Sequence, residues 1–184
     1  CPQPSLNISS VKGCWSKKIK MTSFTRKMLD NVSTAISTEK YYDHLAKSYE
    51  QISERRSRFN LAIDDEILSL NRNKKIETML DVGSGNGLRA KKIGQVLEVK
   101  RLYLSDVSNK MLKLCRKNVP EAMAVDLKVK TLESISVKFD IITIQWNVLG
   151  HVGSFEDKIN LLESCRQCLA SGGQIFLEHA LQFR

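Results

Sequence analysis

Short apolar runs alternate with longer amphipathic segments from residue 78 onward. The runs have the length of β-strands, and the segments between them repeat apolar residues at helical spacing. One run contains Phe139, Ile141, Ile142 and Ile144, which is typical of a strand buried on both faces of a sheet. The expected strands are 78–82, 101–105, 127–131, 139–145 and 174–178. This alternation predicts an α/β fold with a doubly wound, mostly parallel sheet and helices on both faces.

Helices are expected before the first strand and between the later ones. Those between strands are 88–97, 109–118 and 155–169. We expect the last of them to stop at Ser171-Gly172-Gly173, because glycine commonly follows the end of a helix. Two more helices, at 37–51 and 59–70, precede the first strand. The chain is thus expected to comprise a tail (1–35), an N-terminal helical segment (36–75) and an α/β core (76–184).

The tail differs in composition from the rest of the chain. It is rich in serine, and residues 1–29 contain six Lys or Arg side chains and no acid. Since the net charge of the whole chain is +9, the remainder is only mildly basic, and a nucleic-acid partner is an alternative that we do not favour. We expect a poorly ordered tail and a cytoplasmic protein. The same composition is found in organelle transit peptides, so an organellar location is the alternative.

Cysteine usage and hydropathy exclude further classes of protein. Cys165-x-x-Cys168 is a single pair within a helical segment, without the second pair that a zinc site needs, so we expect no metal. The odd total of five cysteines suggests a reducing compartment. No window of 18 residues is continuously apolar, which argues against a membrane span. The oligomeric state is left open.

A glycine-rich turn follows the first expected strand, in Leu80-Asp81-Val82-Gly83-Ser84-Gly85-Asn86-Gly87. In an open α/β sheet this is where a nucleotide-like ligand binds, and glycine permits its close approach to the backbone. A dinucleotide-binding turn would need its third glycine at Leu88, and a phosphate-binding loop would end in Gly-Lys-Ser/Thr. Both are absent, which favours a nucleoside without a diphosphate.

The turn resembles motif I of the class I S-adenosylmethionine (SAM) dependent methyltransferases, written D/E-x-G-x-G-x-G. Its defining positions are matched by Asp81, Gly83, Gly85 and Gly87. The resemblance spans about residues 41–180 and includes Phe139-Asp140-Ile141-Ile142 and the Gly172-Gly173 turn. It implies a Rossmann-like fold, a methyltransferase activity and SAM as the cofactor.

Asp106 lies 23 residues after Gly83, at the end of the second expected strand. An acidic side chain at this spacing accepts hydrogen bonds from ribose hydroxyls, and a carboxylate offers two oxygens for them. The alternative is an exposed aspartate that caps the following helix.

The resemblance implies further cofactor contacts. The Tyr41–Tyr49 segment resembles a lid that places a tyrosine against the ligand, although a plain amphipathic helix is an equal alternative. Adenine would be contacted at Thr131 and Leu132, with Asp126 as a competing alignment. The full set of expected cofactor-binding residues is Asp81, Gly83, Ser84, Gly85, Gly87, Asp106, Val107, Thr131, Leu132, Gln145, Tyr41 and Tyr49.

Methyl transfer from a sulfonium is an in-line displacement, in which the protein mainly aligns the reacting atoms. A general base is needed only where the acceptor must lose a proton, and His151 is a weak candidate for it. We expect a small-molecule acceptor. The alternatives are an RNA- or protein-modifying methyltransferase and a non-catalytic SAM-binding partner subunit.

The family's sheet has two further strands after the fifth. Because this chain stops at Arg184, we expect a sheet that is truncated after its fifth strand, and the activity of such a chain is uncertain.

Overall fold

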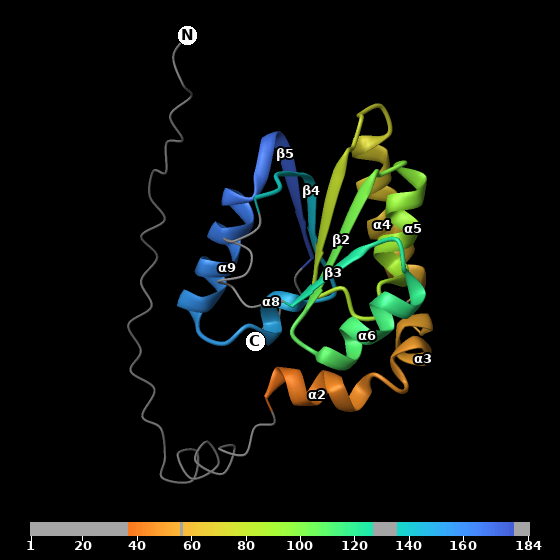
Figure 1. The fold of residues 1–184 in the computed structure, drawn as a ribbon, viewed down its shortest axis with the longest axis vertical. Coiled ribbons are helices and arrows are strands. Elements are labelled where there is room, and N and C mark those ends of the chain that lie inside the picture. The colour runs from red at the N-terminus through yellow and green to blue at the C-terminus, as the bar shows by residue number, and fades with distance from the viewer. Residues whose placement is uncertain (1–36, 56, 127–135, 179–184) are drawn as a thin grey trace, which may run out of the picture. The chain divides into compact units, whose positions relative to one another are not determined.

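The computed structural model describes residues 37–55, 57–126 and 136–178, and within them the chain forms a parallel five-stranded sheet flanked by helices (Figure 1). The strands are β1 (Thr78–Val82), β2 (Arg101–Asp106), β3 (Met123–Asp126), β4 (Phe139–Ile144) and β5 (Leu169–Leu177). Their order is β3-β2-β1-β4-β5, so the chain moves outward from β1 in one direction and then in the other. The predicted α/β fold with a doubly wound parallel sheet is confirmed.

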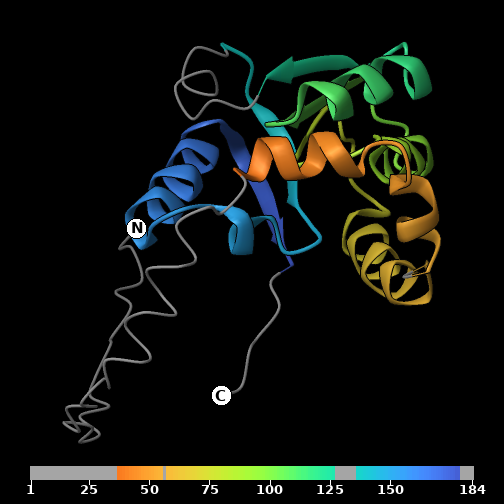
Figure 2. The same ribbon diagram turned by 90° about the horizontal axis from the view of Figure 1, so that it is seen from below.

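Helices connect the strands and precede them. They are α2 (Thr38–Leu45), α3 (Tyr49–Glu54), α4 (Ser57–Asn71), α5 (Leu88–Val96), α6 (Asn109–Asn118), α8 (Val148–His151) and α9 (Phe155–Gln167). Figures 1 and 2 show α9 on one face of the sheet and α4 and α5 on the other. No described helix is both long and apolar enough to cross a membrane.

Alternate residues of the central strands feed two separate hydrophobic clusters. Leu80 and Ile142 point to the face covered by α8 and α9, where they join the buried Leu161. Met79 and Ile141 point to the opposite face, where they pack with residues of α4, α5 and α6. Since successive strand residues face opposite sides, a strand covered on both faces is mainly apolar on both sides. This explains the mainly apolar runs in the sequence, in which Asp81 and Thr143 are buried polar exceptions.

Three expected elements differ from the structure by more than two residues, and the first is in the N-terminal segment. The helix expected at 37–51 is two helices, α2 and α3. Ser48 interrupts it, because its N–H and its Oγ both donate to the carbonyl of Leu45, at 2.9 and 3.4 Å. A serine that bonds to nearby backbone offers the chain an alternative to the helical hydrogen-bond pattern.

The third strand begins earlier than expected. β3 covers Met123–Asp126, in register with Tyr103–Asp106 of β2, and the expected range 127–131 lies outside the described residues. The connection from α6 is short: Val119 caps the helix, and the N–H of Ala122 donates to its carbonyl at 3.0 Å. A turn this tight returns the chain to the sheet at once.

The glycines after α9 lie inside β5 rather than ahead of it. The helix ends at Gln167, and β5 begins at Leu169 opposite Phe139, but Ile141 then pairs with Gln174. The extra residues form a bulge, in which Gly172 has a φ of +78°. A Cβ on Gly173 would lie 2.7 Å from the carbonyl oxygen of Phe139, so the bulge requires glycine there. The Gly-Gly pair therefore shapes the strand and does not stop the helix.

Candidate ligand-binding site

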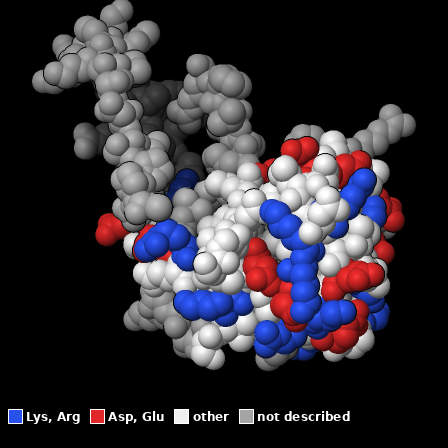
Figure 3. All heavy atoms as spheres, turned by 90° about the horizontal axis from the view of Figure 1, so that it is seen from above, with Lys and Arg blue, Asp and Glu red and all other residues white. Residues whose placement is uncertain are grey.

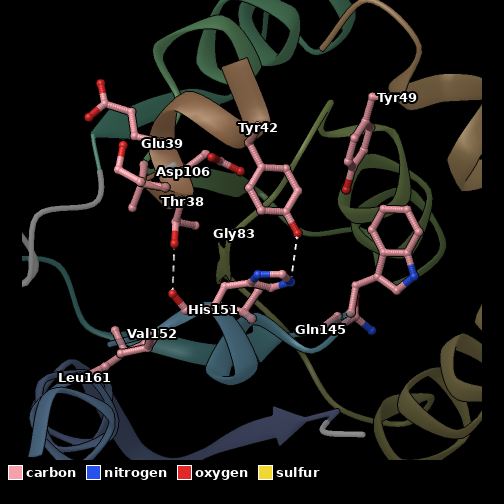
Figure 4. A pocket seen from close by; sticks show the side chains of 14 residues that line it. Thr38, Glu39, Tyr42, Tyr49, Gly83, Asp106, Gln145, His151, Val152 and Leu161 are labelled. Carbon is pink, nitrogen blue, oxygen red and sulfur yellow. Dashed lines mark hydrogen bonds between the residues drawn. The ribbon is translucent and has the colours of Figure 1, made fainter. Parts of the chain in front are cut away.

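A cavity of about 410 Å³ opens at the carboxyl ends of the strands, beside the switch point between β1 and β4 (Figure 4). This is the place where open α/β sheets bind ligands. One wall is formed by the Gly83–Gly87 turn and Asp106, here called the floor, of which Gly83 and Asp106 line the cavity. The opposite wall is α2, here called the lid. Residues of α8, α9 and the end of β4 close the sides.

The floor turn depends on backbone conformations that only glycine adopts easily. Gly83, Gly85 and Gly87 have φ values of +75°, +56° and +79°. The amides of Gly83 and Ser84 donate to the carbonyl of Ser105, at 2.7 and 2.9 Å, which ties the turn to β2. The Ser84 hydroxyl donates to the carbonyl of Asp81 at 2.8 Å. Ser84 thus holds the turn from below and does not line the cavity.

Each glycine also lies where a side chain would collide with a neighbour. A Cβ on Gly85 would fall on the phenol ring of Tyr49, which lines the cavity and is 7% exposed. A Cβ on Gly83 would meet the side chain of Val148, and one on Gly87 would approach Leu104 Cδ1 to 2.9 Å. Gly83 and Gly85 therefore leave room for the cavity-lining side chains of Val148 and Tyr49, and Gly87 leaves room for Leu104 of the hydrophobic core.

Asp106 lines the cavity while its carboxylate also holds the floor together. Its Oδ2 accepts from the amide of Gly85 at 3.0 Å, and its Oδ1 accepts from the amide of Ser108 at 2.8 Å. Burial raises the pKa of this carboxyl to about 6, against the lowering effect of the backbone amides. The cap of α6 is Ser108, whose hydroxyl accepts from the amide of Met111. Asp106 is therefore not the exposed helix cap that the alternative expected.

Asp81 lies beneath the floor rather than in the cavity. Thr143 of the neighbouring β4 donates its hydroxyl to Asp81 Oδ1 at 2.5 Å, and the carboxyl is nearly fully buried. Burial raises its pKa to about 6. Its backbone carbonyl accepts from the hydroxyls of both Ser84 and Ser105. Asp81 is thus placed to position the turn across β1, β2 and β4.

The end of β4 carries buried polar groups and unusual backbone. Gln145 lines the cavity and is 6% exposed, and its side chain also interacts with the Asp64 carboxyl and lowers the pKa of that group. Trp146 and Asn147 follow with φ values of +59° and +60°, which are uncommon outside glycine and concentrate at functional sites. The Trp146 ring stands edge-on to Tyr49, with 5.2 Å between their centroids.

The lid is held by side-chain contacts at both ends. Near one end, Asp43 Oδ1 accepts from the hydroxyl of Ser108 at 2.6 Å and from the amide of Lys110 at 3.1 Å. Near the other, Thr38 Oγ1 donates to the carbonyl of His151 at 3.0 Å, and Tyr42 Oη lies 3.1 Å from His151 Nε2. Figure 4 draws both His151 contacts. No residue of α2 is itself buried.

Five of the twelve cofactor contacts expected from the sequence line the cavity, namely Gly83, Asp106, Val107, Gln145 and Tyr49. Four others, Asp81, Ser84, Gly85 and Gly87, lie in or beneath the turn and do not line the cavity. His151 lines it too. Tyr41 does not: it is 46% exposed and stands edge-on to Tyr42, which lines the cavity in its place. Thr131 and Leu132 lie outside the described residues.

Sequence reasoning missed two lid residues and a buried ion cluster. Thr38 and Tyr42 are four positions apart and so share one face of α2, a spacing that could have identified them. In the cluster, Arg89 Nε lies 2.7 Å from Asp64 Oδ1, and its Nη1 lies 3.3 Å from Glu178 Oε2. Burial raises the pKa of Asp64, and the Arg89 cation opposes that rise. The cluster ties α4 and α5 to the end of β5, and no local sequence signal predicts it.

Charged side chains of both signs are mixed on the surface (Figure 3) but are few in the cavity. Figure 3 shows Lys and Arg interspersed with Asp and Glu on one face of the described residues. None of the described residues that line the cavity is a lysine or an arginine. Among the described residues there is also no group of His, Cys, Asp and Glu side chains that could hold a metal ion.

Comparisons with known proteins agree with this geometry. Residues 80–175 match the model of a family described as a methyltransferase domain. The fold is similar to that of DesVI from Streptomyces venezuelae, with a TM-score of 0.62 and 20% identity over 73% of this chain and 57% of that one. CalS10 from Micromonospora echinaspora, an amino pentose methyltransferase solved with SAM, has the same TM-score and identity over 73% and 56% of the two chains.

A further similar structure is the plantazolicin methyltransferase BpumL. It has a TM-score of 0.58 and 24% identity over 73% of this chain and 51% of that chain. The chain thus spans little more than half the length of these solved proteins. No curated protein sequence matches it. At these identities the similar structures establish the fold.

Proposed function

Because the chain belongs to the methyltransferase-domain family, we propose that it transfers a methyl group from SAM to a small-molecule acceptor by in-line displacement. The observation that carries this proposal is the floor: a left-handed glycine turn whose Gly85 amide is bonded to the Asp106 carboxylate, at the switch point of the sheet.

The residues of the cavity fit this cofactor. Asp106 uses one lone pair of each oxygen on a backbone amide, which leaves acceptor capacity for two ribose hydroxyls. Gln145 adds a polar side chain to the lining at the end of β4. Val107 lines the cavity next to Asp106 and offers an apolar contact.

The protein's task in this reaction is alignment. The cofactor supplies a methyl group on a positively charged sulfur, and the residues around it must orient the acceptor and exclude water. Tyr49, Trp146 and Val148 form an apolar side of the cavity suited to that exclusion. Asp81 and Ser84 keep the turn in place from beneath, and so act on the cofactor through Gly85 and Asp106.

The size of the cavity and its cover support a small acceptor. The lid lies over the cavity, and its ends are bonded to α6 and to His151. DesVI and CalS10 share the fold, and CalS10 is described as acting on an amino pentose. An acceptor of comparable size would fit beneath the lid without a macromolecular docking surface.

Titration calorimetry with S-adenosylhomocysteine (SAH) on the full chain tests the proposal. We expect saturable binding by the wild type, and a roughly tenfold to hundredfold loss of affinity in Asp106→Asn, since hydrogen bonds to a charged group contribute about 1.5–3 kcal/mol. Asp65→Asn, an exposed carboxylate on α4, is the matched control and should bind normally. A folded wild-type chain that releases no heat with SAH would refute SAM as the cofactor.

A methyltransferase acting on RNA is the second candidate, and the six basic residues within 1–29 favour it. It predicts RNA binding that weakens steeply with salt and is lost when residues 1–29 are deleted. A non-catalytic SAM-binding subunit is the third candidate. Any methylated product that accumulates with SAM and the chain alone would eliminate it.

A further inference from the structure

Tyr42 and His151 form a polar pair at the rim of an otherwise apolar part of the cavity. Tyr42 Oη lies 3.1 Å from His151 Nε2, and both side chains line the cavity (Figure 4). The two residues are 109 positions apart, on the lid and at the end of α8. Lid and core therefore meet through two groups that can each donate and accept a proton.

His151 is anchored in a way that suits a base. Its carbonyl accepts from Thr38 Oγ1 at 3.0 Å, which fixes the backbone beside the ring. The Tyr42 and His151 rings stand edge to face, with centroids 5.3 Å apart. His151 is an exposed residue, so a proton that reaches its imidazole can leave to bulk water.

We propose that this pair is a proton relay for the acceptor, and that the acceptor is an apolar molecule whose nucleophile is a hydroxyl group. The proposal rests on the proposed methyl transfer. The Tyr42 hydroxyl faces the acceptor and donates to His151 Nε2, and the single N–H proton of the neutral imidazole is on Nδ1.

Atoms and charge are conserved in this step. The acceptor oxygen forms a bond to the methyl carbon, and the carbon–sulfur bond breaks with its electron pair passing to sulfur. The acceptor proton moves to the oxygen of Tyr42 while the Tyr42 proton moves to His151 Nε2. The positive charge that begins on sulfur thus ends on the imidazolium, and His151 then releases the proton to water.

The lining of the cavity selects the acceptor class. Around the pair lie Val148, Val152 and Leu161, which offer no hydrogen bonds from their side chains. The absence of lysine and arginine from the described lining disfavours a phosphate or a carboxylate on the acceptor. A neutral amine or a thiolate attacks without losing a proton first, whereas a hydroxyl gains most from a relay. The other titratable lining groups are Glu39, Asp106 and Tyr49.

Two bicyclic probes of matched size test the relay on the full chain with SAM. 2-Naphthol must lose a proton to accept a methyl group, whereas quinoline attacks through a free lone pair. We expect the wild type to methylate 2-naphthol, and Tyr42→Phe and His151→Gln each to lower kcat by about 10²–10⁴-fold, the usual contribution of general base catalysis. In both variants the rate should follow the fraction of 2-naphthol that ionises in water. His44→Gln, an exposed histidine elsewhere on the lid, should keep the wild-type rate and pH profile.

SAH titration separates the relay from a purely structural contact. Affinity should stay within about twofold of wild type in both variants, while kcat falls. If SAH affinity falls in step with kcat, the pair holds the lid closed and the relay is refuted. An unchanged kcat in either variant would overturn the relay. So would a wild-type enzyme that methylates only quinoline or neither probe, and this result would also overturn the acceptor class. In each of these cases, SAH binding would leave the proposed function intact. Failure of SAH to bind would instead remove the proposed function.

Discussion

The floor and the lid of the cavity are built in different ways. The floor is held by backbone hydrogen bonds and by two buried carboxyls whose pKa values burial raises. The lid has no buried residue and is held by the side chains of Thr38, Tyr42 and Asp43. Hydrogen bonds of the exposed lid compete with water, whereas those of the floor do not. The comparison indicates a preformed floor and a separable cover.

The largest expected effect is at the floor. Gly85→Ala should destabilise the chain by about 2–5 kcal/mol and abolish SAH binding, because it adds left-handed strain (about 1–2 kcal/mol) to overpacking against Tyr49 (about 1–3 kcal/mol). Urea unfolding and calorimetry measure the two effects. Gly94→Ala is the matched control: it lies inside α5, and its Cβ would approach nothing closer than 3.7 Å. It should be neutral or stabilise the helix by up to about 1 kcal/mol. Equal losses of stability and of SAH binding in the two variants would show that the turn does not depend on glycine at position 85.

A smaller effect concerns the pH dependence of the floor. Burial raises the pKa of Asp81 to about 6, so the folded state binds a proton that the unfolded state has already released. The proton on Asp81 therefore adds to the free energy of unfolding at pH values below the pKa that Asp81 has in the unfolded chain. This contribution, on the order of 1–3 kcal/mol, is lost as pH rises through about 6. Urea unfolding between pH 4 and pH 7 should show this fall. Asp81→Asn should reduce the slope and Asp65→Asn should not, and a wild-type stability that rises over this range would contradict the account.

The smallest effect is at the lid, and its sign is opposite. Hydrogen bonds from Ser108 and from the amide of Lys110 hold the pKa of Asp43 below its ordinary value. The ionised Asp43 carboxylate therefore stabilises the docked lid at pH values above the ordinary pKa of aspartate. This stabilisation is lost as pH falls through the lowered pKa of Asp43. Asp43→Asn should speed amide hydrogen exchange in α2 and leave exchange in β1 and β4 unchanged. If exchange in the sheet rose equally, lid and floor would be one cooperative unit.

The order of the elements and the floor turn could be read from local patterns. Each glycine of the turn is required by the conformation of its own backbone, and β1 matches its expected range. The three larger boundary errors arose where individual hydrogen bonds or strand pairing, and not hydrophobic periodicity, decide the structure. Ser48 breaks the N-terminal helix, the turn after α6 brings β3 forward, and the bulge at Gly172 is set by pairing of β5 with β4.

The predicted methyltransferase family is confirmed by the match over residues 80–175, whereas the roles of single site residues remain predictions. Tyr41 and Tyr42 illustrate the difference. Both lie on the lid and both are tyrosines, but only Tyr42 faces the cavity. A helix with no buried residue gives little indication from its own sequence of which face will meet the core.

The sequence alone determined the parallel sheet, the glycine turn and the aspartate at the end of β2, because each depends on strand periodicity, backbone dihedral angles or a fixed spacing along the chain. Only the tertiary structure decided that Asp81 lies beneath the turn, that Arg89 joins Asp64 to Glu178, and that Tyr42 meets His151. These pairs join side chains from distant elements. Their contacts follow from how helices pack on the sheet, which no local pattern encodes.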